Sequence, residues 1–222
     1  DHCAAHAGRG CHGGDPVVCV IELLVLRQMK RFIPEGPAEG VDRFGRKFKS
    51  WREWKNTKDF LSNLPIKVDS SEIFCIDPDP PDIIYREARF EIKEIMDEGR
   101  KRHDEVKREI AEYGRTLPFV SNPSGVFYDI RPNDAADVVI QKLEEFEFRN
   151  KYKEKSHIDL LFYINKKHHF FLEDELTQTA AFEKFGWRSI SCVIGSGTSI
   201  VFHTTPDAPD FLKHCTGKYF SS

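Results

Sequence analysis

The sequence has no apolar run long enough to cross a lipid bilayer. Its apolar stretch from Val17 to Leu26 is interrupted by Glu22, whereas a membrane-spanning helix needs about 20 predominantly apolar residues. The stretch also lacks a basic flank and a clear small-residue cleavage site, which argues against a signal peptide. We therefore expect a soluble, cytoplasmic protein without a membrane partner.

The sequence also lacks a disulfide framework and a strong charge of either sign. Six Cys residues occur, but Cys75 and Cys192 lie inside apolar, strand-like runs, and 222 residues are many for a domain built on disulfides. A reducing compartment is therefore expected. The formal net charge is -3, so nucleic-acid binding would have to depend on a local basic patch.

Methionine is scarce, and the beginning of the chain has low complexity. The chain does not begin with Met, and Met29 and Met96 are its only two. The segment "DHCAAHAGRGCHGGDP" contains two Cys and two His residues, but their spacing matches no known zinc finger. We expect that Met29 is the natural start and that residues 1–28 are a non-native or disordered extension. Residues 29–222 are then expected to form a single domain.

Apolar and aromatic residues are plentiful. Hydrophobic residues make up 40% of the chain and include 18 Phe, which is sufficient for one well-buried core at this length. Periodicity predicts alternating helices and strands, and therefore an α/β fold with a mixed central sheet flanked by helices. The predicted elements are a helix within residues 43–64, strands at 72–76, 82–85 and 89–95, helices at 97–115 and 132–152, a strand at 157–165, a short helix at 177–185, strands within 188–195 and 199–204, and a helical turn at 208–213.

Basic residues far outnumber acidic ones between Arg27 and Lys58, where they are interleaved with Trp51 and Trp54. Basic side chains can hold a phosphate backbone, and aromatic rings can stack on bases. More basic residues lie in the predicted helix at 97–115, although acidic neighbours offset them. A solvated helix face with intrahelical ion pairs, or a docking surface for a protein, would give the same pattern. The candidate nucleic-acid contacts are Arg46, Lys47, Lys49, Arg52, Arg100 and Arg102.

The candidate active site lies on two neighbouring strands. Asp82 opens one strand, and Glu91 and Lys93 share one face of the next because side chains alternate along a strand. A turn at residues 86–88 would place Asp82 across the hairpin from the end of the strand that carries Glu91 and Lys93, so one face would present all three side chains within reach of a shared ion. Carboxylate oxygens suit Mg²⁺, and a Lys can position or deprotonate a water. The pattern predicts metal-assisted phosphodiester cleavage, but a polar hairpin face with a cross-strand Glu–Lys pair remains an alternative.

The spacing of these residues resembles a known superfamily. Pro81-Asp82, a gap of eight residues and then Glu91-Ile92-Lys93 resemble the PD-(D/E)XK nuclease superfamily. The predicted helix-strand-strand-strand-helix-strand order of this restriction-endonuclease-like fold also agrees. The run "PPDIIYREARFEIKEIMDEGRKRHDEVK", with "GWRSIS" and "TPDAPDFL" nearer the end, is similar to a bacterial family of uncharacterised proteins proposed to be endonucleases.

This resemblance implies a role for each residue of the motif. Asp82 and Glu91 would bind Mg²⁺ or Mn²⁺, the backbone carbonyl of Ile92 would add a ligand, and Lys93 would orient the attacking water. Superfamily members often add a Glu from the first helix, for which Glu53 is the candidate. The implied activity is a hydrolase that cleaves DNA, and a homodimer is left open. A catalytically inactive module of the same fold, binding nucleic acid or a protein partner, remains the competing hypothesis.

Overall fold

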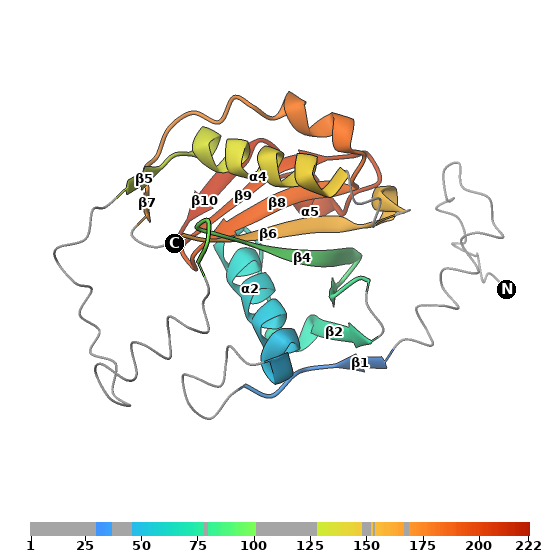
Figure 1. Cartoon of the computed structure of the whole chain (residues 1–222). Helices are drawn as coiled ribbons and strands as arrows, with labels where there is room; N and C mark the ends of the chain where they lie inside the picture. The colour runs from blue at the N-terminus through green and yellow to red at the C-terminus, as the bar shows by residue number, and fades with distance from the viewer. Residues whose placement is uncertain are drawn as a thin grey trace, which may run out of the picture. The chain divides into compact units, whose positions relative to one another are not determined.

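A computed structural model of the chain describes residues 30–36, 46–77, 80–100, 128–147, 152, 154–166 and 169–222 (Figure 1). The chain divides into two units, Asp1–Lys30 and Arg31–Ser222. Within the described ranges, no helix is long and apolar enough to cross a membrane.

The described part of the chain is built on an eight-stranded mixed sheet (Figure 1). Strands β2, β3 and β4 pair antiparallel, β4, β6 and β8 pair parallel, and β8, β9 and β10 pair antiparallel. The predicted mixed α/β class is therefore confirmed. The strands, in sheet order, are β1 (Lys30–Phe32), β2 (Ile73–Asp77), β3 (Ile83–Tyr85), β4 (Ala88–Met96), β6 (Asp159–Asn165), β8 (Ser189–Ile194), β9 (Thr198–Thr204) and β10 (Lys218–Ser221).

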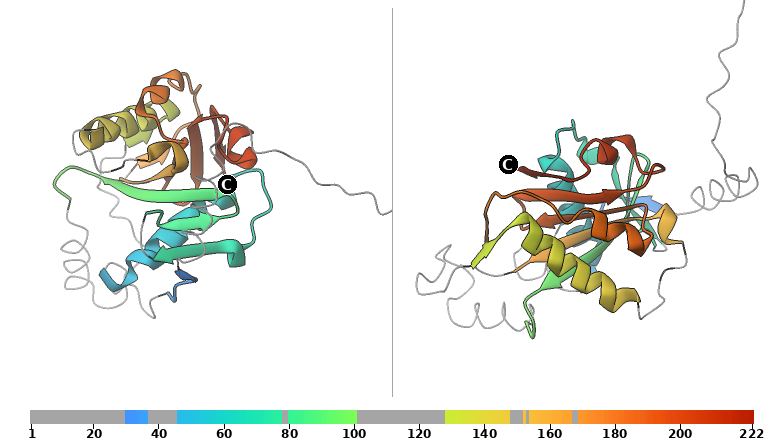
Figure 2. Two further views of the ribbon diagram at one scale, coloured as in Figure 1. Left: turned by 90° about the vertical axis from the view of Figure 1, so that its right-hand side faces the viewer. Right: turned by 90° about the horizontal axis from the view of Figure 1, so that it is seen from above.

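Helices cover both faces of the sheet (Figure 2). Helix α2 (Lys49–Asn63) packs Phe60 and Leu61 on the face that carries Phe90 and Ile92 of β4. The opposite face carries Leu160 and Phe162 of β6. It is covered by α4 (Pro132–Glu147), which contributes Val139 and Leu143, and by a 3-10 helix, η5 (Ala180–Phe185). Successive residues of a strand point to opposite faces. Strands β4 and β6 therefore each contribute side chains to the hydrophobic cores on both faces of the sheet.

Helix α4 begins where the sequence predicts. Pro132 stands at the first helical position, where its missing N–H removes no intrahelical hydrogen bond. The Asp134 carboxylate accepts a hydrogen bond from the Arg131 backbone N–H at 2.8 Å and complements the positive end of the helix. The end of the helix was predicted wrongly, because α4 ends at Glu147 and Tyr152 lies beyond it. An apolar residue at helical spacing can instead make a tertiary contact, as Tyr152 does.

The predicted strands of the first half are confirmed as β2, β3 and β4. The turn between β3 and β4 is Arg86–Glu87, whereas Ala88, predicted to lie in the turn, is the first residue of β4. Strands β6, β8 and β9 and the predicted short helices are also found, the latter as η5 and as α5 (Asp210–Lys213). Most of the predicted helix at 97–115 lies outside the described residues, and its described start, 97–100, is a turn.

Four strands were not predicted as separate elements, and one of them is the three-residue β1. Strands β5 (Tyr128–Ile130) and β7 (His169–Phe171) pair parallel in a two-stranded sheet, and β10 pairs with β9 at the edge of the large sheet. Each has only three or four residues, which is too few for alternation to be recognised. Pairing with a distant partner, rather than local pattern, creates these strands.

A buried ion pair joins the beginnings of three strands. The Asp159 carboxylate of β6 is fully buried and accepts hydrogen bonds from the Arg89 N–H of β4 and the Ser189 hydroxyl of β8, both at 2.8 Å. Arg188 donates from its Nε to the same carboxylate at 3.1 Å and from Nη2 to its other oxygen. Arg188 also donates to the carbonyl of Glu87 at 3.1 Å. Arg188 therefore anchors the beginnings of these strands.

Candidate active site

Asp82 immediately precedes strand β3. The pairing of β3 with β4 ends at Ile83 and Phe90, so the residues of β4 after Phe90 have no partner in β3. There the Ile92 N–H donates to Asp82 Oδ2 at 2.9 Å. In an antiparallel pair the N–H and C=O of one residue face the same neighbour, so the Ile92 carbonyl faces the side of Asp82 as well. The local backbone thus brings together Asp82 and the predicted backbone ligand.

One ammonium group joins Asp82 to the first helix. Lys49 Nζ lies 3.1 Å from Asp82 Oδ1 and 3.0 Å from Glu53 Oε1. Lys49 and Glu53 face each other because they are one helical turn apart on α2. The Asp82 side chain is 2% exposed and that of Glu53 13%, whereas that of Lys49 is 53% exposed. The structure therefore places Glu53 beside Asp82, with Lys49 bridging the two carboxylates from the solvent side.

Burial and the neighbouring charges shift the pKa values of Glu53 and Lys49. Burial, followed by the charge of Asp82, raises the pKa of Glu53 to about 7, although Lys49 and Lys93 act in the opposite direction. Burial acts to lower the pKa of Lys49, but the carboxylates of Asp82 and Glu53 outweigh it and raise that pKa above its usual value. Lys49 therefore stays protonated, and Glu53 can gain or lose a proton near neutral pH.

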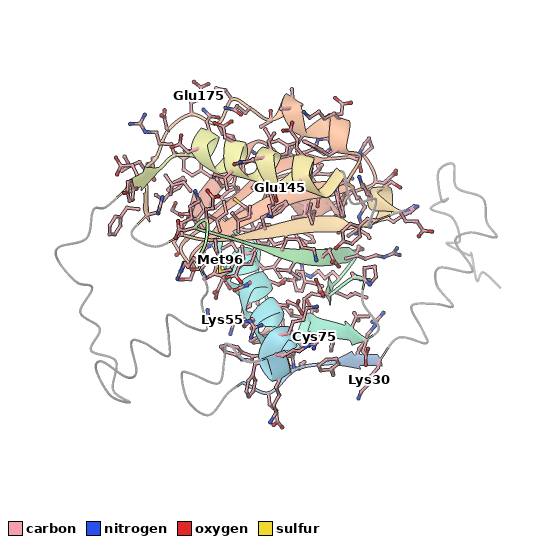
Figure 3. All side chains as sticks on the ribbon, in the orientation of Figure 1. Lys30, Lys55, Cys75, Met96, Glu145 and Glu175 are labelled. Atoms are coloured by element: carbon pink, nitrogen blue, oxygen red, sulfur yellow. The ribbon has the colours of Figure 1, made fainter. Side chains whose placement is uncertain are left out.

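Cys75 of β2 lies near α2 (Figure 3) and senses the charges of Glu53 and Asp82. Its thiol is buried and donates to the carbonyl of Ser50 in α2 at 3.4 Å. Burial, followed by the charges of Glu53 and Asp82, raises the pKa of this thiol to about 12. Cys75 is therefore a neutral thiol that forms the apolar floor between α2 and the sheet.

The raised pKa of Glu53 predicts a pH-dependent stability. Between the ordinary pKa of 4.5 and about 7, Glu53 keeps its proton in the folded protein and loses it in the unfolded one. The unfolded state then binds fewer protons, so the free energy of unfolding falls as the pH rises through this window. We expect urea unfolding from pH 4.5 to 7.5 to show a steeper fall for the wild type than for Glu53→Gln. Parallel curves for the two proteins would contradict the assigned burial of this carboxyl.

Glu91 and Lys93 lie on the other face of β4, below α4. In the parallel pairing with β6 they stand opposite Leu160 and Phe162, which belong to the core under α4. The predicted alternation of β4 is thus confirmed. This face is not open to solvent at Glu91, which is only 4% exposed. A strand with partners on both edges and helices over both faces has little wet surface.

The Glu91 carboxylate is held through one of its two oxygens. Lys93 Nζ and the Tyr152 hydroxyl each donate to Glu91 Oε1, both at 2.5 Å. The other oxygen, Oε2, is buried and has no hydrogen-bond partner among the described residues. An unpaired buried carboxylate oxygen is costly, so this atom is the strongest indication that the site serves a ligand.

The described residues contain no group of three or more His, Cys, Asp or Glu side chains arranged to hold a metal ion. The predicted ligand set is smaller, with two carboxylates, Asp82 and Glu91, and the carbonyl of Ile92. Mg²⁺ commonly uses one or two carboxylates and keeps several waters, and no group among the residues that the structure describes donates to the buried Glu91 Oε2. The donor types suit Mg²⁺, although Lys49 occupies Asp82 Oδ1 and Glu91 lies on the α4 face of β4.

The remaining candidates are scattered. Arg46 and Lys47 are exposed on a 3-10 turn, η2 (Arg46–Phe48), just before α2, and Arg52 is half-buried on α2. Arg100 donates to the carbonyl of Asn165 at 2.7 Å, and Arg102 lies outside the described residues. The structure thus brings Lys49, but not Arg100, to the carboxylate cluster.

Sequence reasoning missed Tyr152 as a site residue. It lies 61 residues from its partner Glu91, and no local motif connects the two. The helix predicted over residues 132–152 would make it the last apolar position of that helix. The contact between Tyr152 and Glu91 depends on the parallel pairing of β4 with β6. Tyr152 precedes β6 in the chain, and this pairing brings it next to β4.

The fold and the site together define a mixed α/β protein with a carboxylate and lysine cluster at the junction of α2, β3 and β4. The chain belongs to the family described as "Putative endonuclease, protein of unknown function" (DUF1780), which it matches over residues 31–221. The resemblance found in the sequence to a family of uncharacterised proteins proposed to be endonucleases is thereby confirmed.

A solved structure shares the fold. It is the protein of unknown function PA4535 from Pseudomonas aeruginosa strain PAO1, assigned to the monooxygenase superfamily. The TM-score is 0.53 with 21% sequence identity, and the match covers 78% of this chain and 83% of that one. At this identity the likeness concerns the fold alone. No curated protein shows a significant match to the chain.

Proposed function

We propose that the chain is a metal-dependent endonuclease that hydrolyses phosphodiester bonds of DNA, with a core of the PD-(D/E)XK type. The observation that carries the proposal is the buried Oε2 of Glu91, which has no hydrogen-bond partner in the described part of the chain. It lies next to Lys93, on the strand whose Ile92 amide holds Asp82. The element order α2-β2-β3-β4-α4-β6, with β4 and β6 parallel, supports this type of core. The family description points to the same chemistry.

Each residue of the site then has a role. Asp82 and Glu91 would hold Mg²⁺ or Mn²⁺, together with the carbonyl of Ile92, and the bound ion would stabilise the charge that grows on the phosphate. Lys93, whose ammonium lies 2.5 Å from Glu91 Oε1, would orient the attacking water. Glu53, with a pKa of about 7, is suited to accept a proton near neutral pH.

The basic residues before α2 support a nucleic-acid substrate. Arg46 and Lys47 are exposed and precede Lys49, which contacts Asp82 directly. A phosphate backbone approaching the site from this end would therefore meet positive charge first. DNA is the substrate implied by the resemblance to PD-(D/E)XK nucleases.

Incubation of the purified protein with single-stranded, duplex and branched DNA, and with RNA, tests the proposal. We expect cleavage of at least one DNA form with Mg²⁺ or Mn²⁺, and none with EDTA. The Arg46→Glu/Lys47→Glu double variant should weaken substrate binding, and its loss of affinity should shrink as salt rises. Lys142→Glu, a change on the exposed surface of α4, serves as the charge control. Cleavage that persists in EDTA would rule out the metal-dependent mechanism.

One observation favours a second function, that of a binding module without catalysis. Lys49 already pairs with both Asp82 and Glu53, and burial favours the protonated form of Glu53, so this half of the site needs no ion to remain buried. A protein of this kind would bind nucleic acid or a protein partner and have no affinity for Mg²⁺ or Mn²⁺ at the site. Metal binding therefore separates the two functions.

A further inference from the structure

Tyr152 reaches the candidate active site from the segment between α4 and β6. Its hydroxyl donates to Glu91 Oε1 at 2.5 Å. Its ring packs edge-on against Trp187, with the ring centroids 5.1 Å apart, and Trp187 is 2% exposed and part of the core under α4. The phenol is therefore supported by a rigid apolar wall and points at a carboxylate.

Lys93 completes the arrangement around Glu91. Its ammonium donates to the same Glu91 Oε1 and lies 5.7 Å from the centre of the Tyr152 ring. A cation at this distance from an aromatic face is attracted to it. Tyr152 thus contacts the two central groups of the site at once, the carboxylate through its hydroxyl and the ammonium through its ring.

The two donors leave the carboxylate asymmetric. Both hydrogen bonds reach Oε1, whereas Oε2 is buried without a partner among the described residues. A carboxylate can rotate about its terminal torsion, which is a broad and roughly two-fold rotor. Two donors on one oxygen restrict that rotation, so Oε2 keeps one direction.

We propose that Tyr152 is a positioning residue that fixes the Glu91 carboxylate so that Oε2 is presented to the metal ion. This inference rests on the proposed metal-dependent function, and it assigns to Tyr152 no contact with the ion or the substrate. Groups that hydrogen-bond to metal-binding carboxylates orient them, and loss of such a group typically weakens metal affinity by about 10–100-fold.

Tyr152→Phe tests the inference, because it removes the hydroxyl and keeps the ring against Trp187 and Lys93. The matched control is Tyr85→Phe, which removes another phenol, bonded at 3.5 Å to the carbonyl of Lys67 on the α2 side of the sheet. Mn²⁺ is titrated calorimetrically into the wild type and both variants, and thermal melting is recorded without metal. Cleavage kinetics with saturating Mg²⁺ separate kcat from KM.

We expect Tyr152→Phe to bind Mn²⁺ about 10–100-fold more weakly than the wild type and to need correspondingly more metal for cleavage. KM for the nucleic acid should stay unchanged, and the metal-free melting temperature should fall by no more than the loss of one hydrogen bond implies. Tyr85→Phe should keep the wild-type affinity for Mn²⁺. Equal Mn²⁺ affinities in Tyr152→Phe and the wild type would overturn the positioning role and leave the proposed function standing. A wild type without any Mn²⁺ affinity would overturn both.

Discussion

Replacement of Lys93 or Asp82 is expected to abolish Mg²⁺-dependent cleavage while the protein stays folded. Lys93 would orient the attacking water, and the loss of such a group reduces the rate by about 10²–10⁴-fold. Lys93→Ala removes the ammonium from Glu91 Oε1, where the Tyr152 hydroxyl still donates, so the carboxylate keeps one partner. By the argument made for Tyr152, loss of one of the two donors on Oε1 should also weaken metal binding, so kcat is measured at saturating Mg²⁺, where we expect it to be greatly reduced.

Asp82 calls for two variants, because its carboxylate also holds the Ile92 N–H. Asp82→Ala removes both the proposed ligand and this hydrogen bond, whereas Asp82→Asn keeps an oxygen acceptor and loses only the charge. Both should lose cleavage, and Asp82→Asn should melt near the wild-type temperature. Asp59→Asn, on the same helix as Glu53 and paired at 2.5 Å with Lys55, is the matched control. Full cleavage by Asp82→Asn and Lys93→Ala would rule the site out.

Asp159→Ala is expected to destabilise the protein strongly, without a direct effect on chemistry. Arg188 is 8% exposed, and loss of Asp159 would leave its guanidinium buried without its counter-charge. Removal of one partner from a buried pair costs about 3–5 kcal/mol, a large fraction of the stability of a domain. The Arg89 N–H and the Ser189 hydroxyl would lose their acceptor as well.

Urea unfolding at neutral pH measures this effect. Glu145→Ala, which breaks the exposed pair with Lys142 on α4, is the control and should unfold close to the wild type, as surface pairs contribute little. Where Asp159→Ala remains folded at low temperature, it should bind Mn²⁺ like the wild type. A midpoint for Asp159→Ala equal to that of Glu145→Ala would show that the buried pair does not fix the strands.

The sequence was sufficient to predict the hairpin that carries the site, because its information is local. Alternation along 88–95 sets which residues of β4 face α2 and which face α4, and the spacing of Asp82 from Glu91 follows from a two-residue turn. Glu53 could be selected because it is an acidic residue on the helix that precedes these strands. The pairing of Lys49 with it is an ordinary contact between residues one helical turn apart.

The remaining features depend on contacts that are distant in sequence. Glu91 is buried because β6 pairs with β4 along one edge and α4 packs over this face of the sheet. No pattern within residues 81–94 predicts that burial. Tyr152 and the edge strand β10 owe their positions to partners elsewhere in the chain. The sequence predicts that Lys49 contacts nucleic acid. Its ion pairs with Glu53 and Asp82 cannot both be predicted from the sequence, because the second depends on the packing of α2 next to β3.

Calorimetric titration of Mn²⁺ into the wild type and Asp82→Asn tests most directly whether Asp82 and Glu91 form a metal site. The proposed site predicts binding to the wild type that is lost or greatly weakened in Asp82→Asn, with Asp59→Asn unchanged. Lys49 must leave Asp82 on binding, so Lys49→Met should bind Mn²⁺ more tightly than the wild type. A wild type that binds no Mn²⁺, or binds it as well as Asp82→Asn does, would contradict the account and favour a binding module without catalysis.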